Sequence, residues 1–178
     1  MNRVDAAPTS IRISAVRTGE ERDRVYVNRD DGSEVSWSWI RDERSLPHDL
    51  EHWVVETGAR LSHGFWGLVA EGLDPKRVNK MADRIASGIT LRDLSGRDIT
   101  ELIQAESLTT AVGQLRVASA EQAIVELAGA CQRFGVEPPV VRAVDLTTME
   151  GRVGDLQRAW FDTPEGTALE LDFPNWEA

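Results

Sequence analysis

In the first half of the chain, three side chains that can bind a metal ion recur at every fourth position. His48, His52 and Glu56 share one stripe if the segment is helical, because residues four apart lie on the same face of an α-helix. Two imidazoles one turn apart can bind the same divalent ion, with a carboxylate as the third ligand and an open position for water. The spacing therefore predicts a divalent-metal site, for example for zinc, in which Glu56 or a distal carboxylate is the third ligand.

A second pattern overlaps the first. The five residues from His48 to His52 satisfy His-x-x-Glu-His, the motif of the inverzincin metalloproteases, in which the histidines bind zinc and the glutamate is the general base. Glu51 is the catalytic candidate on this interpretation. The chain resembles the inverzincins over these five residues only, and short motifs often match by chance. The third histidine, His63, lies past Gly58, and nothing in the sequence requires it to join the stripe.

The same stripe also has a metal-free interpretation. A helix that packs through Leu50, Trp53 and Val54 needs polar residues on its outer face, and two histidines with several carboxylates meet that need. Asp49, near the helix N-terminus, is favourable with the macrodipole whether or not a site exists. Two functions stay open: a metal-dependent protein, such as a hydrolase of a small or peptide substrate, and a metal-free interaction or structural domain whose acidic surface meets a basic partner.

The helix that carries the stripe has recognisable ends. Ser45 is the expected N-cap, and Pro47 fits the first turn, where its missing N–H leaves nothing unpaired. Gly58 is the expected C-cap. A short helix follows at 64–71, and we expect its apolar residues, Phe65 among them, to lie in the core.

The whole stretch resembles a group of uncharacterised bacterial proteins. Their pattern is Leu-Pro-His-Asp-Leu-x-His-aromatic-x-Val-Glu, followed shortly by Gly-Phe-aromatic-Gly-Leu-Val-Ala. The matching residues in this sequence are Leu46, Pro47, His48, Asp49, Leu50, His52, Trp53, Val55 and Glu56, then Gly64, Phe65, Trp66, Gly67, Leu68, Val69 and Ala70. The resemblance implies that His48, Asp49, His52 and Glu56 belong together as a unit, and it leaves the position of Glu51 free. It brings no known activity with it.

Alternation of apolar and polar residues predicts a small sheet built from the two ends of the chain. Residues 11–16 form a weak alternating strand, and Asp31-Gly32 separates two further alternating runs, which is a strong hairpin signal. The expected buried face of this hairpin carries Val25, Val27, Trp37 and Trp39. Residues 168–173 alternate cleanly, and this closing strand has only the N-terminal sheet to join.

Capping signals and helical periodicity predict five or six helices between the strands. After the two helices described above, the expected spans are 75–88, 99–116, 120–134 and 148–161, with a loop at 91–96. Helices that cover one face of a small, mostly antiparallel sheet form an α+β fold. We therefore predict a single α+β domain over residues 1–178, with a loose N-terminal tail at 1–9.

Composition limits the expected partners. Twenty basic against thirty acidic residues give a formal net charge of −10, which phosphate backbones and anionic membrane surfaces repel, so neither nucleic acid nor a membrane is an expected partner. The N-terminus lacks the apolar core of a signal peptide, and no segment approaches the ~20 apolar residues of a membrane-spanning helix. Cys131 is the single cysteine, expected to be buried and inert, and its isolation suits a reducing compartment. These features predict a cytoplasmic protein.

Overall fold

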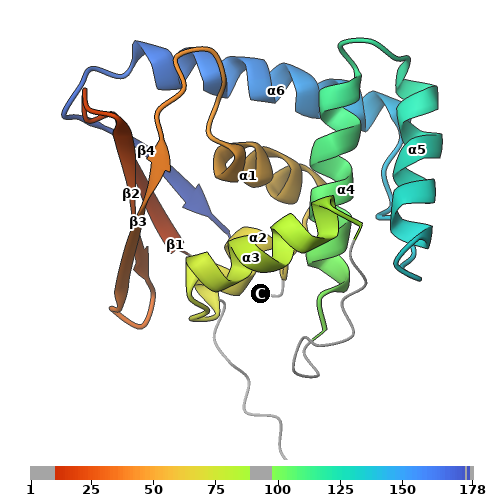
Figure 1. Ribbon diagram of the computed structural model, residues 1–178, viewed down its shortest axis with the longest axis horizontal. Coiled ribbons are helices and arrows are strands. Elements are labelled where there is room, and N and C mark those ends of the chain that lie inside the picture. Colours follow the sequence, from red (N-terminus) through yellow and green to blue (C-terminus); the bar gives the residue numbers. More distant parts are fainter. Residues whose placement is uncertain (1–10, 89–97, 175, 177–178) are drawn as a thin grey trace, which may run out of the picture.

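A computed structural model of the chain describes residues 11–88, 98–174 and 176, so the tail expected at 1–9 and the loop expected at 91–96 lie outside the described residues. The strands form one antiparallel sheet in the order β3-β2-β1-β4. Their bounds are β1 (Ile11–Val16), β2 (Arg22–Arg29), β3 (Glu34–Ile40) and β4 (Ala168–Phe173). Six helices lie on one side of this sheet (Figure 1). The predicted α+β class, with three N-terminal strands and one C-terminal strand, is confirmed.

The hairpin of β2 and β3 turns at the predicted glycine. Gly32 has a φ of +81°, which an L side chain adopts only with strain, and its N–H donates to the carbonyl of Arg29 at 2.9 Å. In the resulting register Val25 lies opposite Trp37. Val25 and Val27 are fully buried, while the two tryptophans of β3 are half-buried. The predicted inward face of the hairpin is therefore confirmed.

The closing strand β4 pairs with β1, which becomes a central strand. Leu171 lies opposite Ile13, and Phe173 lies opposite Ile11. Phe173 is 2% exposed and both isoleucines of β1 are buried, so this pairing closes the core at the end of the sheet. The N-terminal and C-terminal segments thus depend on each other.

Loss of the Phe173 ring should therefore destabilise the whole fold. We expect Phe173→Ala to lower the free energy of unfolding by about 3–5 kcal/mol, and deletion of 167–178 to cost more, because β1 then loses a neighbour. Urea denaturation followed by tryptophan fluorescence measures both effects. Asp172→Ala, on the exposed face of the same strand, is the control, with an expected change within about 0.5 kcal/mol. A truncated chain with an unchanged melting temperature would contradict the pairing.

Six helices occur in the described chain. They are α1 (His48–Ala59), α2 (Phe65–Ala70), α3 (Pro75–Ala86), α4 (Thr100–Gln114), α5 (Ala120–Gln132) and α6 (Ala143–Asp162). The capping box of Ser119 and Gln122 that starts α5 is present as predicted. None of the described helices is long and apolar enough to cross a membrane.

Several predicted helix ends are wrong. Helix α1 has Pro47 in the N-cap position, because the Ser45 hydroxyl donates to Asp42 instead of capping the helix. Gly58 lies inside α1, and the C-cap residue that follows the helix is Arg60, in a left-handed conformation with a φ of +55°. A Cβ at Gly58 would lie 2.9 Å from the methyl carbon of Met149, so this glycine allows α6 to pack closely against α1.

Helix α6 begins at Ala143, five positions before the predicted start at 148. Its start is fixed by hydrogen bonds that the backbone N–H and the guanidinium of Arg142 donate to the carboxylate of Asp145, a pair that the usual capping-box pattern does not contain. Its two interior glycines do not end it, because a continuous buried stripe holds the helix against its neighbours. This stripe consists of Leu146, Met149, Val153, Leu156 and Trp160.

Tryptophans of the sheet fix the position of α1. The indole N–H groups of Trp37 and Trp39 both donate to the same carboxylate oxygen of Asp49, at 2.8 Å and 2.7 Å. The indole of Trp66, from α2, donates to the backbone carbonyl of Asp49 at 2.7 Å. Asp49 is 4% exposed, so the first turn of α1 is joined to the sheet and to α2 through one buried residue.

Candidate metal centre

Helix α1 buries much of the stripe that carries its histidines. His48 keeps 56% of its side chain exposed, whereas His52 and Glu56 have 1% and 0% exposure. The interpretation of this stripe as a solvated outer face is therefore wrong for His52 and Glu56. The reason is that α2 and α4 pack against α1, where Glu106 of α4 contacts His52 and the first residue of α2 contacts Glu56.

The carboxylate of Glu56 holds the N-terminus of α2. Its two oxygens accept the backbone N–H groups of Phe65, at 2.7 Å, and Trp66, at 3.0 Å. Helix α2 has no side-chain cap of its own, so a residue of α1 supplies the missing acceptor. A Cβ at Gly64 would lie 2.4 Å from the carboxyl carbon of Glu56, which explains the glycine at this position.

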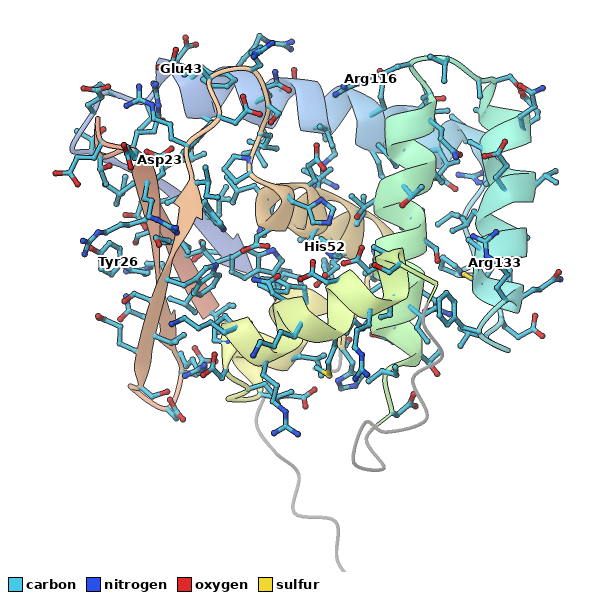
Figure 2. The ribbon with its side chains drawn as sticks, in the orientation of Figure 1. Asp23, Tyr26, Glu43, His52, Arg116 and Arg133 are labelled. Atoms are coloured by element: carbon cyan, nitrogen blue, oxygen red, sulfur yellow. The ribbon has the colours of Figure 1, made fainter. Side chains whose placement is uncertain are left out.

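His52 lies between two buried carboxylates. Its Nδ1 is 3.0 Å from Oε1 of Glu56, and its Nε2 is 2.9 Å from Oε1 of Glu106 on α4. Figure 2 labels His52 in the interior of the helical layer. Glu106 is 5% exposed and lies 54 positions after His52 in the sequence. It was not among the predicted site residues. The sequence contains one signal for Glu106. This charged residue follows Leu102 by four positions and Ile103 by three, so it lies on the stripe of α4 that faces the core.

His48 repeats the arrangement of His52 at the protein surface. Its Nε2 is 3.7 Å from Oε2 of Glu106, and its Nδ1 is 3.2 Å from Oε2 of Glu51. The two imidazole rings lie 4.8 Å apart, at 85° to each other. Both Nε2 atoms therefore face Glu106, and each Nδ1 faces a different glutamate of α1.

The neighbouring carboxylates favour the charged form of both histidines. Hydrogen bonds to Glu106 and Glu51 raise the pKa of His48 to about 9. Burial by itself would lower the pKa of His52, but its hydrogen bonds to Glu106 and Glu56 outweigh burial and raise this pKa to about 10.

The pKa values of the two glutamates that contact His52 shift in opposite directions. Burial would raise the pKa of Glu106, yet the two histidines bring it down to about 2. Burial raises the pKa of Glu56 above its ordinary value, against the opposing effect of His52 and of two backbone N–H groups. At neutral pH the metal-free protein thus holds two charged imidazoles between carboxylates.

A hydrogen atom or a metal ion must lie between Nε2 of His52 and the carboxylate of Glu106. If Glu56 accepts the Nδ1–H of His52, a neutral ring presents a lone pair at Nε2, and Glu106 presents another at 2.9 Å. Two acceptors at this distance repel each other unless a proton or a metal ion joins them. In the absence of metal a proton fills this role, and the raised pKa of His52 is its consequence.

The residues fit a metal ion in number and type. His48, His52 and Glu106 each offer one ligand atom, and these atoms all lie within 4.8 Å of one another. In a tetrahedral zinc site with bonds of ~2.0–2.2 Å, two ligand atoms lie about 3.3–3.6 Å apart, so the most widely spaced atoms of the group must move together by about one ångström. The ring of His48 has room to make this adjustment because 56% of its side chain is exposed.

The other predicted residues lie outside this group. Glu56 and Glu51 face the Nδ1 atoms, on the far side of each ring from Glu106. His63 contacts Glu71 and takes no part in the group. Cys131 is buried as predicted, and burial raises the pKa of its thiol, which opposes reactivity at neutral pH.

Comparison with protein-family models, with curated proteins and with solved structures finds no match to this chain. The resemblance to the group of bacterial proteins with the Leu-Pro-His-Asp-Leu motif stays a prediction. A function for the site must therefore be argued from the geometry of its own residues.

Proposed function

We propose that the chain binds a divalent metal ion, with zinc as the first choice, and uses it to hydrolyse a small or peptide substrate. The ligands are Nε2 of His48, Nε2 of His52 and the carboxylate of Glu106. One observation carries the proposal: both Nε2 atoms face the same carboxylate, while each Nδ1 is held by a separate glutamate.

This arrangement supplies the outer partners that metal-binding histidines need. A ligating histidine donates its second N–H to a carboxylate or carbonyl, which fixes the ring and raises its basicity. Glu56 does this for His52, and its own position is fixed by two backbone N–H groups of α2. Glu51 does this for His48. Glu51 is thereby assigned to positioning and not to the general-base role that the His-x-x-Glu-His motif suggested.

The donor set suits a site with open positions. Two histidines and one carboxylate are the protein ligands of several hydrolytic zinc sites, and bound zinc lowers the pKa of its water to about 7. The exposed side chain of His48 leaves the group open to solvent on one side. The other two ligands, His52 and Glu106, are themselves buried, so water reaches the group from the side of His48.

A metal-free structural role is the second candidate. Glu51, His48, Glu106, His52 and Glu56 form a continuous chain of contacts, and protons alone can satisfy it. This chain joins α1 to α2 and α4, so it contributes to the fold in any case. In this alternative the acidic surface of the protein, with a net charge of −10, meets a basic partner.

Zinc titration by calorimetry separates the two candidates. We expect the wild type, freed of metal by a chelator and dialysed, to bind about one zinc ion and to melt at a higher temperature with zinc present. His48→Ala and Glu106→Gln should each weaken binding by more than about a hundredfold, because each removes a ligand. His48 is exposed, so its removal should leave the fold unchanged, and circular dichroism checks the fold of both variants.

The matched control is His63→Ala, which removes a partly exposed histidine outside the group and should leave zinc affinity unchanged within about twofold. Wild-type affinity no tighter than that of an ordinary surface histidine pair would contradict the proposal. Equal loss in His63→Ala and His48→Ala would contradict it as well. Either result favours the metal-free role.

A further inference from the structure

A cavity of about 90 Å³ lies where α1, α4 and α6 meet, next to the candidate metal centre. It shares one residue with that centre, because Glu51 lines the cavity and also contacts Nδ1 of His48. Its α4 wall starts at Thr109, one turn after Glu106. The remaining lining residues are Val55, Val112, Gly113, Arg116, Glu150, Val153, Gly154 and Gln157.

The floor of this cavity is apolar and its rim carries charge. Val55, Val112 and Val153 are at most 8% exposed, and they come from three different helices. Arg116 and Glu150 are exposed, and within the described part of the chain neither forms an ion pair or a side-chain hydrogen bond. The third charged residue, Glu51, already has the His48 ring as its partner. One unpaired cation and one unpaired anion therefore remain at the rim.

Two glycines keep the cavity open at a cost to the helices. Gly113 lies inside α4 and Gly154 inside α6, where glycine is a poor helix former. A Cβ at Gly113 would meet no atom within 4 Å, and one at Gly154 would meet only an Nη1 of Arg158, at 3.7 Å. Helix packing therefore does not require glycine at either position. Both glycines line the cavity, where a side chain would occupy space that a ligand needs.

We propose that this cavity binds a free aliphatic α-amino acid of the size of valine or leucine. A cavity of about 150 Å³ holds benzene, which has six non-hydrogen atoms, so about 90 Å³ has room for the three or four carbon atoms of a valine or leucine side chain, while the charged groups of the ligand lie at the open rim. The ligand carboxylate pairs with Arg116, its ammonium pairs with Glu150, and its side chain lies on the three valines. Binding of the amino acid does not require the metal ion. The inference rests on the proposed function only in the biological role of this ligand, since peptide hydrolysis releases such an amino acid.

Calorimetry with three probes of similar size tests the proposal, in the presence of a chelator so that zinc plays no part. The probes are L-leucine, 4-methylpentanoate, which lacks the ammonium group, and 3-methylbutylamine, which lacks the carboxylate. We expect saturable binding of one L-leucine, at least about tenfold tighter than either analogue, because each analogue leaves one charge of the rim unpaired.

Variants of Arg116 and Glu150 test which charged group of the ligand each residue binds. Arg116→Gln should weaken L-leucine about tenfold and leave 3-methylbutylamine unchanged, and Glu150→Gln should leave 4-methylpentanoate unchanged. The matched control is Arg133→Gln, an exposed arginine at the end of α5; Figure 2 labels it on the opposite side of α4 from α1, whereas Arg116 lies beside α6. Arg133→Gln should bind L-leucine like the wild type. Gly113→Leu should abolish L-leucine binding but keep zinc affinity.

Absence of L-leucine binding, or an analogue that binds as tightly, would overturn the inference. These results leave the zinc proposal standing if zinc still binds. Conversely, L-leucine binding by a chain with no zinc affinity would support the cavity and refute the metal centre. The two proposals therefore fail separately.

Discussion

Zinc affinity is expected to rise steeply with pH, beyond the range in which ordinary histidines titrate. Bound metal must replace a proton on His48 and another on His52, because their pKa values are raised to about 9 and about 10. At pH values below both pKa values, each proton that zinc displaces makes the zinc affinity rise about tenfold per pH unit. Affinity should therefore increase by up to about a hundredfold per unit between about pH 6 and about pH 8.

Competition with a chelator of known pH dependence measures this slope. Calorimetry in two buffers of different ionisation enthalpy counts the protons directly, and about two should be released per zinc ion near pH 7. A pair of ordinary histidines, with pKa values of ~6.5, would reach constant affinity above about pH 7.5. Such a plateau in the wild type, or release of less than one proton, would show that zinc does not bind at His48 and His52.

Removal of the Glu56 carboxylate is expected to cause the largest loss of stability among single changes at the site. Glu56→Ala should lower the free energy of unfolding by about 3–5 kcal/mol, because it leaves the buried imidazolium of His52 with one partner instead of two. It also leaves the backbone N–H groups of Phe65 and Trp66 without an acceptor. Urea denaturation of the metal-free protein measures the change.

The pH of that experiment follows from the pKa shifts. The folded-state pKa of His52 is above its ordinary 6.5, so its contribution is complete below pH 6.5 and is lost as pH rises towards about 10. The folded-state pKa of Glu106 is below its ordinary 4.5, so its contribution is complete above pH 4.5 and is lost as pH falls towards about 2. Because burial raises the pKa of Glu56 above its ordinary 4.5, the charged form of this carboxylate is favoured at the upper end of the range from pH 4.5 to 6.5, so the comparison belongs near pH 6.5.

The matched control is Glu51→Ala, which removes a glutamate of the same helix that also contacts a histidine. Glu51 is 26% exposed and its partner His48 is 56% exposed, so this loss should stay below about 1 kcal/mol. Similar losses for the two variants would mean that Glu56 contributes no more than a surface partner. Glu56→Gln should fall between them, since the amide keeps an acceptor oxygen but removes the charge.

Local signals in the sequence were enough for the elements and for part of the site. Period-two alternation predicted β1 and β4, Asp31-Gly32 predicted the hairpin, and Ser119 with Gln122 predicted the start of α5. These features depend on residues within a few positions of one another, and a single sequence contains that information. Where neighbours override local chemistry, as at Ser45 and Gly58, the predicted helix ends were wrong.

The helical period also placed His48, His52 and Glu56 on one stripe of α1, but it could not show what covers that stripe. Burial of His52 comes from α2 and α4, which pack against α1, and Trp66 of α2 is held there by the backbone carbonyl of Asp49. Glu106, on α4, reaches the two Nε2 atoms across 54 positions of sequence, and no local rule connects residues so far apart. The sequence therefore determined which side chains α1 offers, while long-range packing decided which nitrogen each histidine presents and which carboxylate it meets.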